Sequence, residues 1–166
     1  YNTIDYDYGS YGSAIMGSTT DESEFAVSGT SIDDFFNGAW SATNSKSSVW
    51  GSMYKGINVC NQVMEKFVGL TFPDYEMNSD YDYQMARYKN YKWEARFWRA
   101  YFYFNLAKQY GGVPLITKVQ STDVTNKAPR ATSDETFKFI IDECNLVQDS
   151  IVKNPADFNL PSEIDN

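Results

Sequence analysis

Apolar residues recur at helical spacing in the middle of the chain. Over Glu94–Ala107, a turn of 100° per residue places apolar side chains on two faces of a helix, with narrow polar seams between them. A surface helix usually shows one apolar stripe, so this helix is predicted to lie between two layers of neighbours. The first face carries Phe97, Ala100, Tyr101, Phe104 and Ala107, the second carries Ala95, Trp98, Phe102 and Leu106, and one seam carries Arg96, Arg99 and Tyr103.

The end of this helix is marked by two glycines, Gly111 and Gly112. Either glycine can adopt the left-handed backbone conformation that closes a helix, and Pro114 prevents the helix from continuing. The complete helix is predicted over residues 82–110, and a short apolar, strand-like segment follows as far as Thr117.

Two more amphipathic helices are predicted, one before and one after this long helix. The first covers residues 47–69, where apolar residues recur at helical spacing between a serine that can cap the helix and Gly69, which suits its end. The second covers residues 133–152, and Thr132-Ser-Asp-Glu135 has the sequence of a capping box at its start. The apolar stripe of the second helix consists of Phe137, Ile140, Ile141, Cys144, Val147 and Ile151.

The remaining segments lack sustained periodicity. Residues 1–46 are rich in Tyr, Gly, Ser, Asp and Thr, and are predicted to form an irregular loop region with one short helix around Asp33–Trp40. Residues 118–131 are polar, contain a proline, and are predicted to form a crossing loop. The pattern as a whole predicts a mainly α protein with long irregular loops.

Two of the predicted helices carry a resemblance to a known family. The pattern Glu-Ala-Arg-Phe-x-Arg-Ala-x-x-Tyr-Phe-x-Leu, followed by Tyr-Gly-Gly-Val-Pro-Leu-Ile, runs from Glu94 to Ile116 and resembles the hallmark of the SusD/RagB family of outer-membrane nutrient-binding lipoproteins. The pattern Trp-x-x-Met-Tyr-x-x-Ile-x-x-Cys-Asn, from Trp50 to Asn61, is similar to a second signature of this family. The resemblance implies tetratricopeptide-like antiparallel helix pairs. It also implies that residues 1–166 are part of the N-terminal helical domain of a longer protein.

Composition narrows the classes of partner. The net charge of −8 and the pI of about 4.5 disfavour nucleic acid and an anionic membrane face, whereas a neutral ligand remains open. No run of eighteen apolar residues is present, so no segment of this sequence is expected to span a bilayer. Both cysteines, Cys60 and Cys144, fall on apolar positions of predicted helices, which favours small buried residues over metal, redox or disulfide roles.

The sequence offers little catalytic chemistry. It contains no histidine, which excludes Ser-His-Asp and Cys-His nucleophile systems and the usual zinc sites from this chain. Acidic pairs such as Asp33 and Asp34 could supply two carboxylates for glycoside hydrolysis, but we interpret them as solvated surface acids. We therefore predict a protein that is not an enzyme and has neither a cofactor nor a metal site.

Aromatic rings close to amides and hydroxyls suggest a sugar-binding chemistry instead. Sugar rings expose C–H faces that stack on aromatic side chains, while their hydroxyls bind amide and carboxylate groups. Trp40 with Asn44 is the pair that we predict to bind a ligand, and the alternative is that Trp40 is a core residue. The resemblance supplies no ligand residue that matches this sequence.

The resemblance implies a function at the cell surface. A SusD-like protein is expected to capture oligosaccharides and deliver them to a partner SusC-like TonB-dependent outer-membrane transporter. It is expected to contact the membrane only through an N-terminal lipid anchor, which is absent from this chain, and to face the cell exterior. Two alternatives remain open, namely a peptide-capturing RagB-like protein and a helical protein-interaction scaffold with no small-molecule site in this segment.

Overall fold

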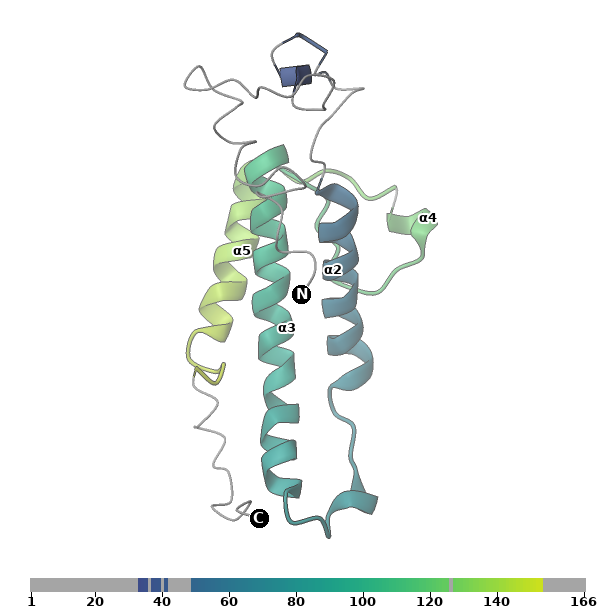
Figure 1. The fold of residues 1–166 in the computed structure, drawn as a ribbon, viewed down its shortest axis with the longest axis vertical. Coiled ribbons are helices and arrows are strands. Elements are labelled where there is room, and N and C mark those ends of the chain that lie inside the picture. Colours follow the sequence, from purple (N-terminus) through teal and green to yellow (C-terminus); the bar gives the residue numbers. More distant parts are fainter. Residues whose placement is uncertain (1–32, 36, 40, 42–48, 126, 154–166) are drawn as a thin grey trace. The chain divides into compact units, whose positions relative to one another are not determined.

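The structure is a computed structural model that describes residues 33–35, 37–39, 41, 49–125 and 127–153. The chain divides into two compact units, Tyr1–Ser52 and Met53–Asn166, and the fold described below is that of the second unit. Its described residues are mostly helical, which confirms the predicted mainly α class (Figure 1). No helix in these described ranges is long and apolar enough to cross a membrane.

The helices largely follow the sequence periodicity but differ at their ends. Where the sequence predicts a helix over 47–69, the structure has α2 followed directly by the π-helical turn η2. The helix predicted over 82–110 agrees with α3 to within one residue. Around Asp33–Trp40 the described residues contain only a single 3₁₀ turn. In chain order the elements are η1 (Asp33–Phe35), α2 (Trp50–Gln62), η2 (Val63–Phe67), η3 (Pro73–Tyr75), α3 (Tyr81–Tyr110), α4 (Thr122–Thr125) and α5 (Ser133–Val147).

Helix α5 ends five residues before the predicted position 152. The Ile151 N–H still donates to the Val147 carbonyl, at 2.9 Å, but the next N–H, that of Val152, donates to the side-chain oxygen of Asn90 on α3. The Ser150 N–H donates to the same Val147 carbonyl, so the residues after Val147 form a turn instead of continuing the α-helix, and the bond to Asn90 replaces the next intrahelical one.

The start of α5 follows the predicted capping box. Thr132 Oγ1 accepts a hydrogen bond from the Glu135 N–H at 3.1 Å, and Glu135 Oε2 accepts one from the Thr132 N–H at 2.8 Å. The Thr132 N–H and, to a smaller extent, the Thr132 hydroxyl donate to the Glu135 carboxylate. These two hydrogen bonds hold the pKa of the Glu135 carboxyl below its ordinary value. The carboxylate form that the cap needs is therefore favoured.

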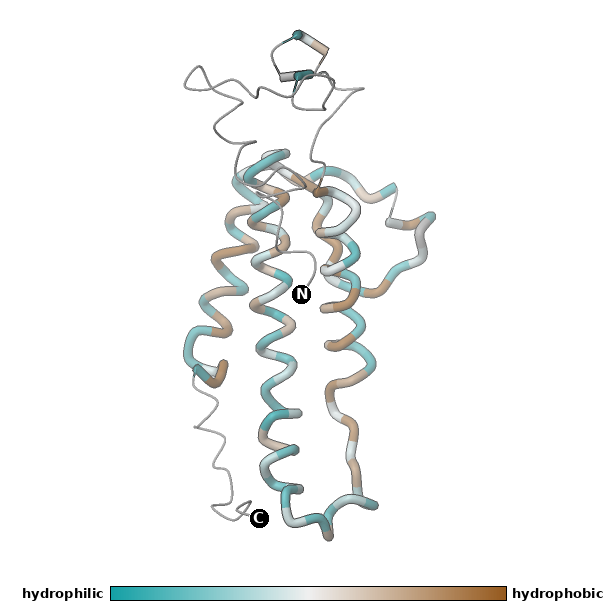
Figure 2. The backbone as a smooth tube through the Cα atoms, in the orientation of Figure 1, coloured by the Kyte–Doolittle hydropathy of each residue, from teal (hydrophilic) through white to brown (hydrophobic). Residues whose placement is uncertain are grey.

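Helix α3 lies between α2 and α5 and runs antiparallel to both (Figure 1). On the α2 side, Gly56 lets the Phe102 ring approach so closely that a Cβ at Gly56 would lie 2.6 Å from the ring. On the α5 side, the rings of Tyr103 and Phe139 meet edge to face, with centroids 5.2 Å apart. Figure 2 shows that the first half of α3 is largely hydrophilic, so the tight packing is concentrated in its second half.

The prediction that both apolar faces of α3 are covered is only partly correct. Phe97 and Phe104 are each 42% exposed, whereas the seam residues Arg99 and Tyr103 are buried. The reason is that this seam meets both neighbouring helices. Arg99 binds Asn61 of α2 and Glu143 of α5, and the Tyr103 ring contacts Phe139 of α5. The buried residues of α3 are Asn90, Ala95, Arg99, Ala100, Phe102, Tyr103, Leu106 and Ala107.

The predicted apolar stripe of α5 is also shifted around the helix. Of its members, Ile140 and Val147 are buried, but Phe137 and Cys144 are exposed and Ile141 is 56% exposed. The other buried positions of α5 are polar, Thr136 and Glu143, because both have polar partners outside the helix, as the next subsection describes.

The two cysteines differ in their surroundings. Cys60 is buried on α2, and burial raises the pKa of its thiol to about 11, so the thiol stays protonated at neutral pH. Cys144 is exposed on α5, so the prediction that it is a buried residue is wrong.

Candidate functional site

The segment that follows α3 is extended and is held by side chains. Gly111 adopts φ +68° at the end of α3, and its N–H donates to the Ala107 carbonyl. Val113 and Ile116 are both buried. Among the described residues this segment has no paired strand, so its backbone hydrogen bonds go mainly to side chains of α2, α3 and α5.

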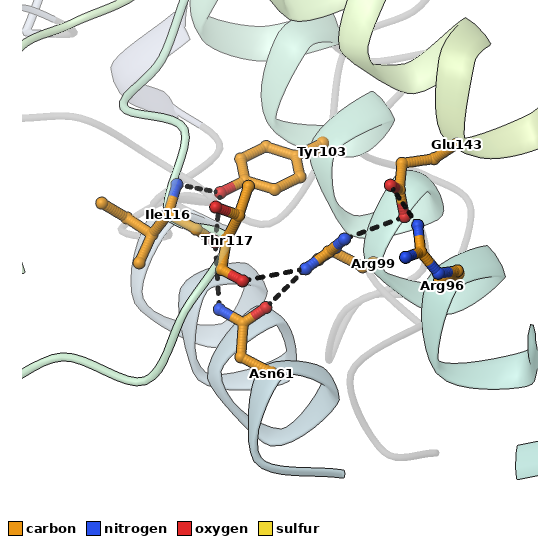
Figure 3. Close-up of polar contacts among 7 residues, drawn as sticks. All are labelled: Asn61, Arg96, Arg99, Tyr103, Ile116, Thr117 and Glu143. Atoms are coloured by element: carbon orange, nitrogen blue, oxygen red, sulfur yellow. Dashed lines mark hydrogen bonds and ion pairs between the residues drawn. The ribbon is translucent and has the colours of Figure 1, made fainter. Parts of the chain in front are cut away.

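Two tyrosines bind the middle of this segment. Tyr103 on α3 accepts a hydrogen bond from the Ile116 N–H at 2.6 Å and donates to the Ile116 carbonyl at 3.1 Å (Figure 3). Tyr54 on α2 donates to the Pro114 carbonyl at 2.7 Å, and its ring meets that of Tyr103 edge to face. Burial is the main cause that raises the pKa of both phenols well above the ordinary value, so both remain neutral donors.

Asn61 and Arg99 continue these contacts toward Thr117. The Asn61 amide donates to the carbonyls of Ile116 (3.0 Å) and Lys118 (3.3 Å), so this buried asparagine of α2 binds backbone of the segment after α3. Arg99 Nη1 donates to Asn61 Oδ1 at 2.8 Å and to the Thr117 carbonyl at 3.2 Å. Figure 3 shows Arg99 reaching Asn61 on one side and Glu143 on the other.

Glu143 on α5 completes the polar network. Its two carboxylate oxygens bind Arg99 Nη2 at 3.0 Å and Arg96 Nη1 at 2.8 Å. Arg99 and Glu143 are almost fully buried, and the Arg99 guanidinium also lies 5.5 Å from the centre of the Phe139 ring. The network of Asn61, Arg96, Arg99, Tyr103 and Glu143 therefore links all three helices to the segment after α3. Buried groups that are paired in this way are suited to fixing structure rather than to meeting a ligand.

Replacing Tyr103 with phenylalanine is expected to lower the free energy of unfolding by about 1–2 kcal/mol. The substitution removes the hydroxyl that binds both backbone groups of Ile116 and leaves them buried without this partner. Urea unfolding followed by circular dichroism measures the difference. Tyr75→Phe, in the 3₁₀ turn η3, is the matched control because Tyr75 is 59% exposed. Equal stability of the two variants would contradict the assigned role of Tyr103.

A small hollow lies between α2 and the segment that this network holds. It has a volume of about 180 Å³ and is lined by Tyr54, Ile57, Asn58, Ile116, Gln120 and Thr125. Ile57 and Ile116 are buried and form an apolar floor, whereas Asn58 and Gln120 are exposed amides. The Tyr54 phenol is the sole ionisable group in this lining, and it stays neutral, so the hollow carries no charge of its own.

The predicted ligand pair lies elsewhere in the sequence. Trp40 and Asn44 are outside the described residues, so their role stays a prediction. The hollow itself was not predicted, because it forms only when Asn58 of α2 and Gln120 of a loop 62 positions later come together. No local sequence signal marks that approach.

Residues 5–158 match the sequence profile of a family described as "Starch-binding associating with outer membrane", the SusD-like proteins. The chain belongs to this SusD-like family. The match covers most of the chain and includes both segments on which the resemblance was based, so that prediction is confirmed. No curated protein matches the sequence.

A solved structure supports the same assignment to the SusD-like family. A SusD-like protein from Bacteroides fragilis NCTC 9343 is 26% identical, with a TM-score of 0.58, over 72% of this chain and 22% of that one. The chain therefore spans about a fifth of the length of that relative. The buried network contains three residues of the two SusD-like signatures, namely Asn61, Arg99 and Tyr103.

Proposed function

We propose that this chain is part of a non-catalytic SusD-like protein that captures oligosaccharides at the cell surface. Membership of a family described as starch-binding and associated with the outer membrane carries the proposal. The finer features, namely lipid anchoring, an outward-facing position and delivery of the glycan to a SusC-like TonB-dependent transporter, belong to the same proposal.

The chemistry of the described residues supports binding rather than catalysis. Glycoside hydrolysis by the usual route needs two carboxyl groups on either side of the scissile bond. The lining of the hollow holds none, and Glu143, a buried carboxylate, is fully engaged by two arginines. The net charge of −8 also favours a neutral ligand over an anionic one.

A second candidate function is a helical protein-interaction scaffold. The exposed aromatic residues Phe97 and Phe104 on α3 and the exposed Ile141 on α5 favour it, because large apolar side chains at a surface often mark a protein contact. This candidate predicts that the chain itself contributes no small-molecule site.

The experiment that tests the proposal is glycan and peptide binding by the intact protein. We expect binding to one class of polysaccharide on an array, confirmed by calorimetry, with roughly tenfold weaker binding in the Trp40→Ala variant if a stacking contact worth about 1–1.5 kcal/mol is lost. Chromatography of the glycan after incubation should show no product above the control without protein.

Four results would count against parts of this proposal. Binding to peptides and to no glycan would favour the RagB-like alternative. Release of shortened glycan would contradict the non-catalytic assignment. Unchanged glycan binding by Trp40→Ala would place the stacking residue elsewhere, and co-purification with the transporter in the absence of any ligand binding would favour the scaffold.

A further inference from the structure

The hollow beside α2 has the size of a single ring. A closed protein cavity of about 150 Å³ can hold one benzene molecule, and this hollow measures about 180 Å³ and is partly open to solvent. Pockets for larger organic ligands are usually at least about 300 Å³. One six-membered ring with its substituents directed outward therefore fits, and a longer segment of ligand has to remain outside.

The lining matches a neutral polyhydroxylated ring. Ile57 and Ile116 offer apolar carbon atoms to the C–H face of such a ring. The amides of Asn58 and Gln120 offer donors and acceptors, and neither side chain has a protein hydrogen bond in the described part of the chain. The Thr125 hydroxyl donates to the Ser121 carbonyl, so its oxygen remains able to accept. A charged ligand would find no opposite charge here.

We propose that this hollow binds one uncharged sugar ring of the captured glycan, with Asn58 and Gln120 as its hydrogen-bonding residues. The inference rests on the proposed function, because it assigns a subsite to the same oligosaccharide. It assigns this subsite to α2 and the loop before α5, separately from the predicted pair Trp40 and Asn44.

Both walls of the hollow are fixed before any ligand arrives. The loop wall is held at one end by Asn61, which binds the Ile116 and Lys118 carbonyls, and next to it by Glu65, whose carboxylate accepts from the Val119 N–H at 2.8 Å. The other wall is helix α2, on which Tyr54 binds the Pro114 carbonyl. A preformed site loses less conformational entropy when it binds, which raises affinity.

The test is calorimetry with the full-length protein and its Asn58→Ala/Gln120→Ala variant. The titrant is maltoheptaose, because the family description names starch, or the tightest-binding oligosaccharide of the array if maltoheptaose does not bind. We expect about a tenfold or greater rise in Kd, since the two amides supply hydrogen bonds that each contribute roughly 1 kcal/mol. Both positions are exposed, and alanine is a better helix former than asparagine at position 58 of α2, so the variant should be no less stable in urea than the wild type.

The control is Asn145→Ala/Gln148→Ala, which removes one asparagine and one glutamine amide that are exposed at the end of α5. This variant should bind the glycan as the wild type does. In the wild type, saturation with glycan should also shift the side-chain amide NMR signals of Asn58 and Gln120. If the wild type binds the glycan and the two double variants have the same Kd, the subsite is wrong and the proposed function stands. Binding of no glycan by the wild type would overturn both.

Discussion

Replacing Arg99 with alanine is expected to lower the free energy of unfolding by about 3–5 kcal/mol. Arg99 is 4% exposed and binds Asn61, the Thr117 carbonyl and Glu143. Its removal leaves Glu143 as a buried carboxylate whose remaining partner is the partly exposed Arg96, and it leaves Asn61 Oδ1 without its donor. Removal of one partner from a buried ion pair is among the most destabilising changes that one substitution can cause.

Urea unfolding of the purified protein, followed by tryptophan fluorescence and circular dichroism, measures this loss. The control is Lys138→Ala, which removes the exposed ion pair between Lys138 and Asp142 one turn apart on α5. That pair is expected to contribute less than about 0.5 kcal/mol because water screens both charges. If Arg99→Ala destabilises the protein no more than Lys138→Ala does, the network is not what joins the three helices.

The burial of Arg99 also shows where sequence periodicity stops being informative. A pattern of apolar and polar residues assigns an arginine to a polar seam and a polar seam to the surface. Whether the seam is buried depends on Glu143, which is 44 positions away on another helix. The same pairing explains why a polar residue occupies a buried position of α5, since Glu143 is buried against Arg99 while Phe137 and Ile141 of the predicted stripe are exposed.

Local signals, by contrast, were sufficient for the three main helices, for the end of α3 and for the start of α5. Thr132 and Glu135 are three residues apart and form the predicted capping box, and Gly111 closes α3 with a positive φ. The resemblance to the SusD-like family rested on two such local segments and is confirmed. The candidate site could not be predicted in the same way, because the hollow is lined by residues such as Ile57 and Ile116, which are distant in the sequence.

Replacing Gly112 with alanine is expected to lower the free energy of unfolding by about 3 kcal/mol or more, at the upper end of the cost of overpacking. A Cβ atom at this position would lie 2.0 Å from the Ala131 carbonyl oxygen and 2.6 Å from the Thr132 carbonyl carbon. These are backbone atoms, so no change of side-chain rotamer can relieve the overlap. Either the start of α5 or the segment after α3 has to move.

Such a movement would break contacts that hold both elements. The Ala131 N–H donates to the Val113 carbonyl at 3.2 Å, and the Val113 N–H donates to Thr136 Oγ1 at 3.3 Å. Arg130 also donates to the Gly112 carbonyl. Because the same segment continues to Ile116 in the floor of the hollow, we expect Gly112→Ala to weaken glycan binding as well as stability.

The sequence offers a matched control for this substitution in Gly51, near the start of α2. Apart from its chain neighbours and the backbone of its own helix, no atom of the described residues lies within 4 Å of a Cβ at Gly51, and its φ is not positive. Gly51→Ala is therefore expected to raise the free energy of unfolding by about 0.4–1 kcal/mol, because alanine restricts the unfolded chain and favours the helix. Thermal and urea unfolding of both variants would show opposite signs. Equal stability of Gly112→Ala and the wild type would mean that α5 and the segment after α3 are not in close backbone contact, and that the floor of the hollow is not fixed by it.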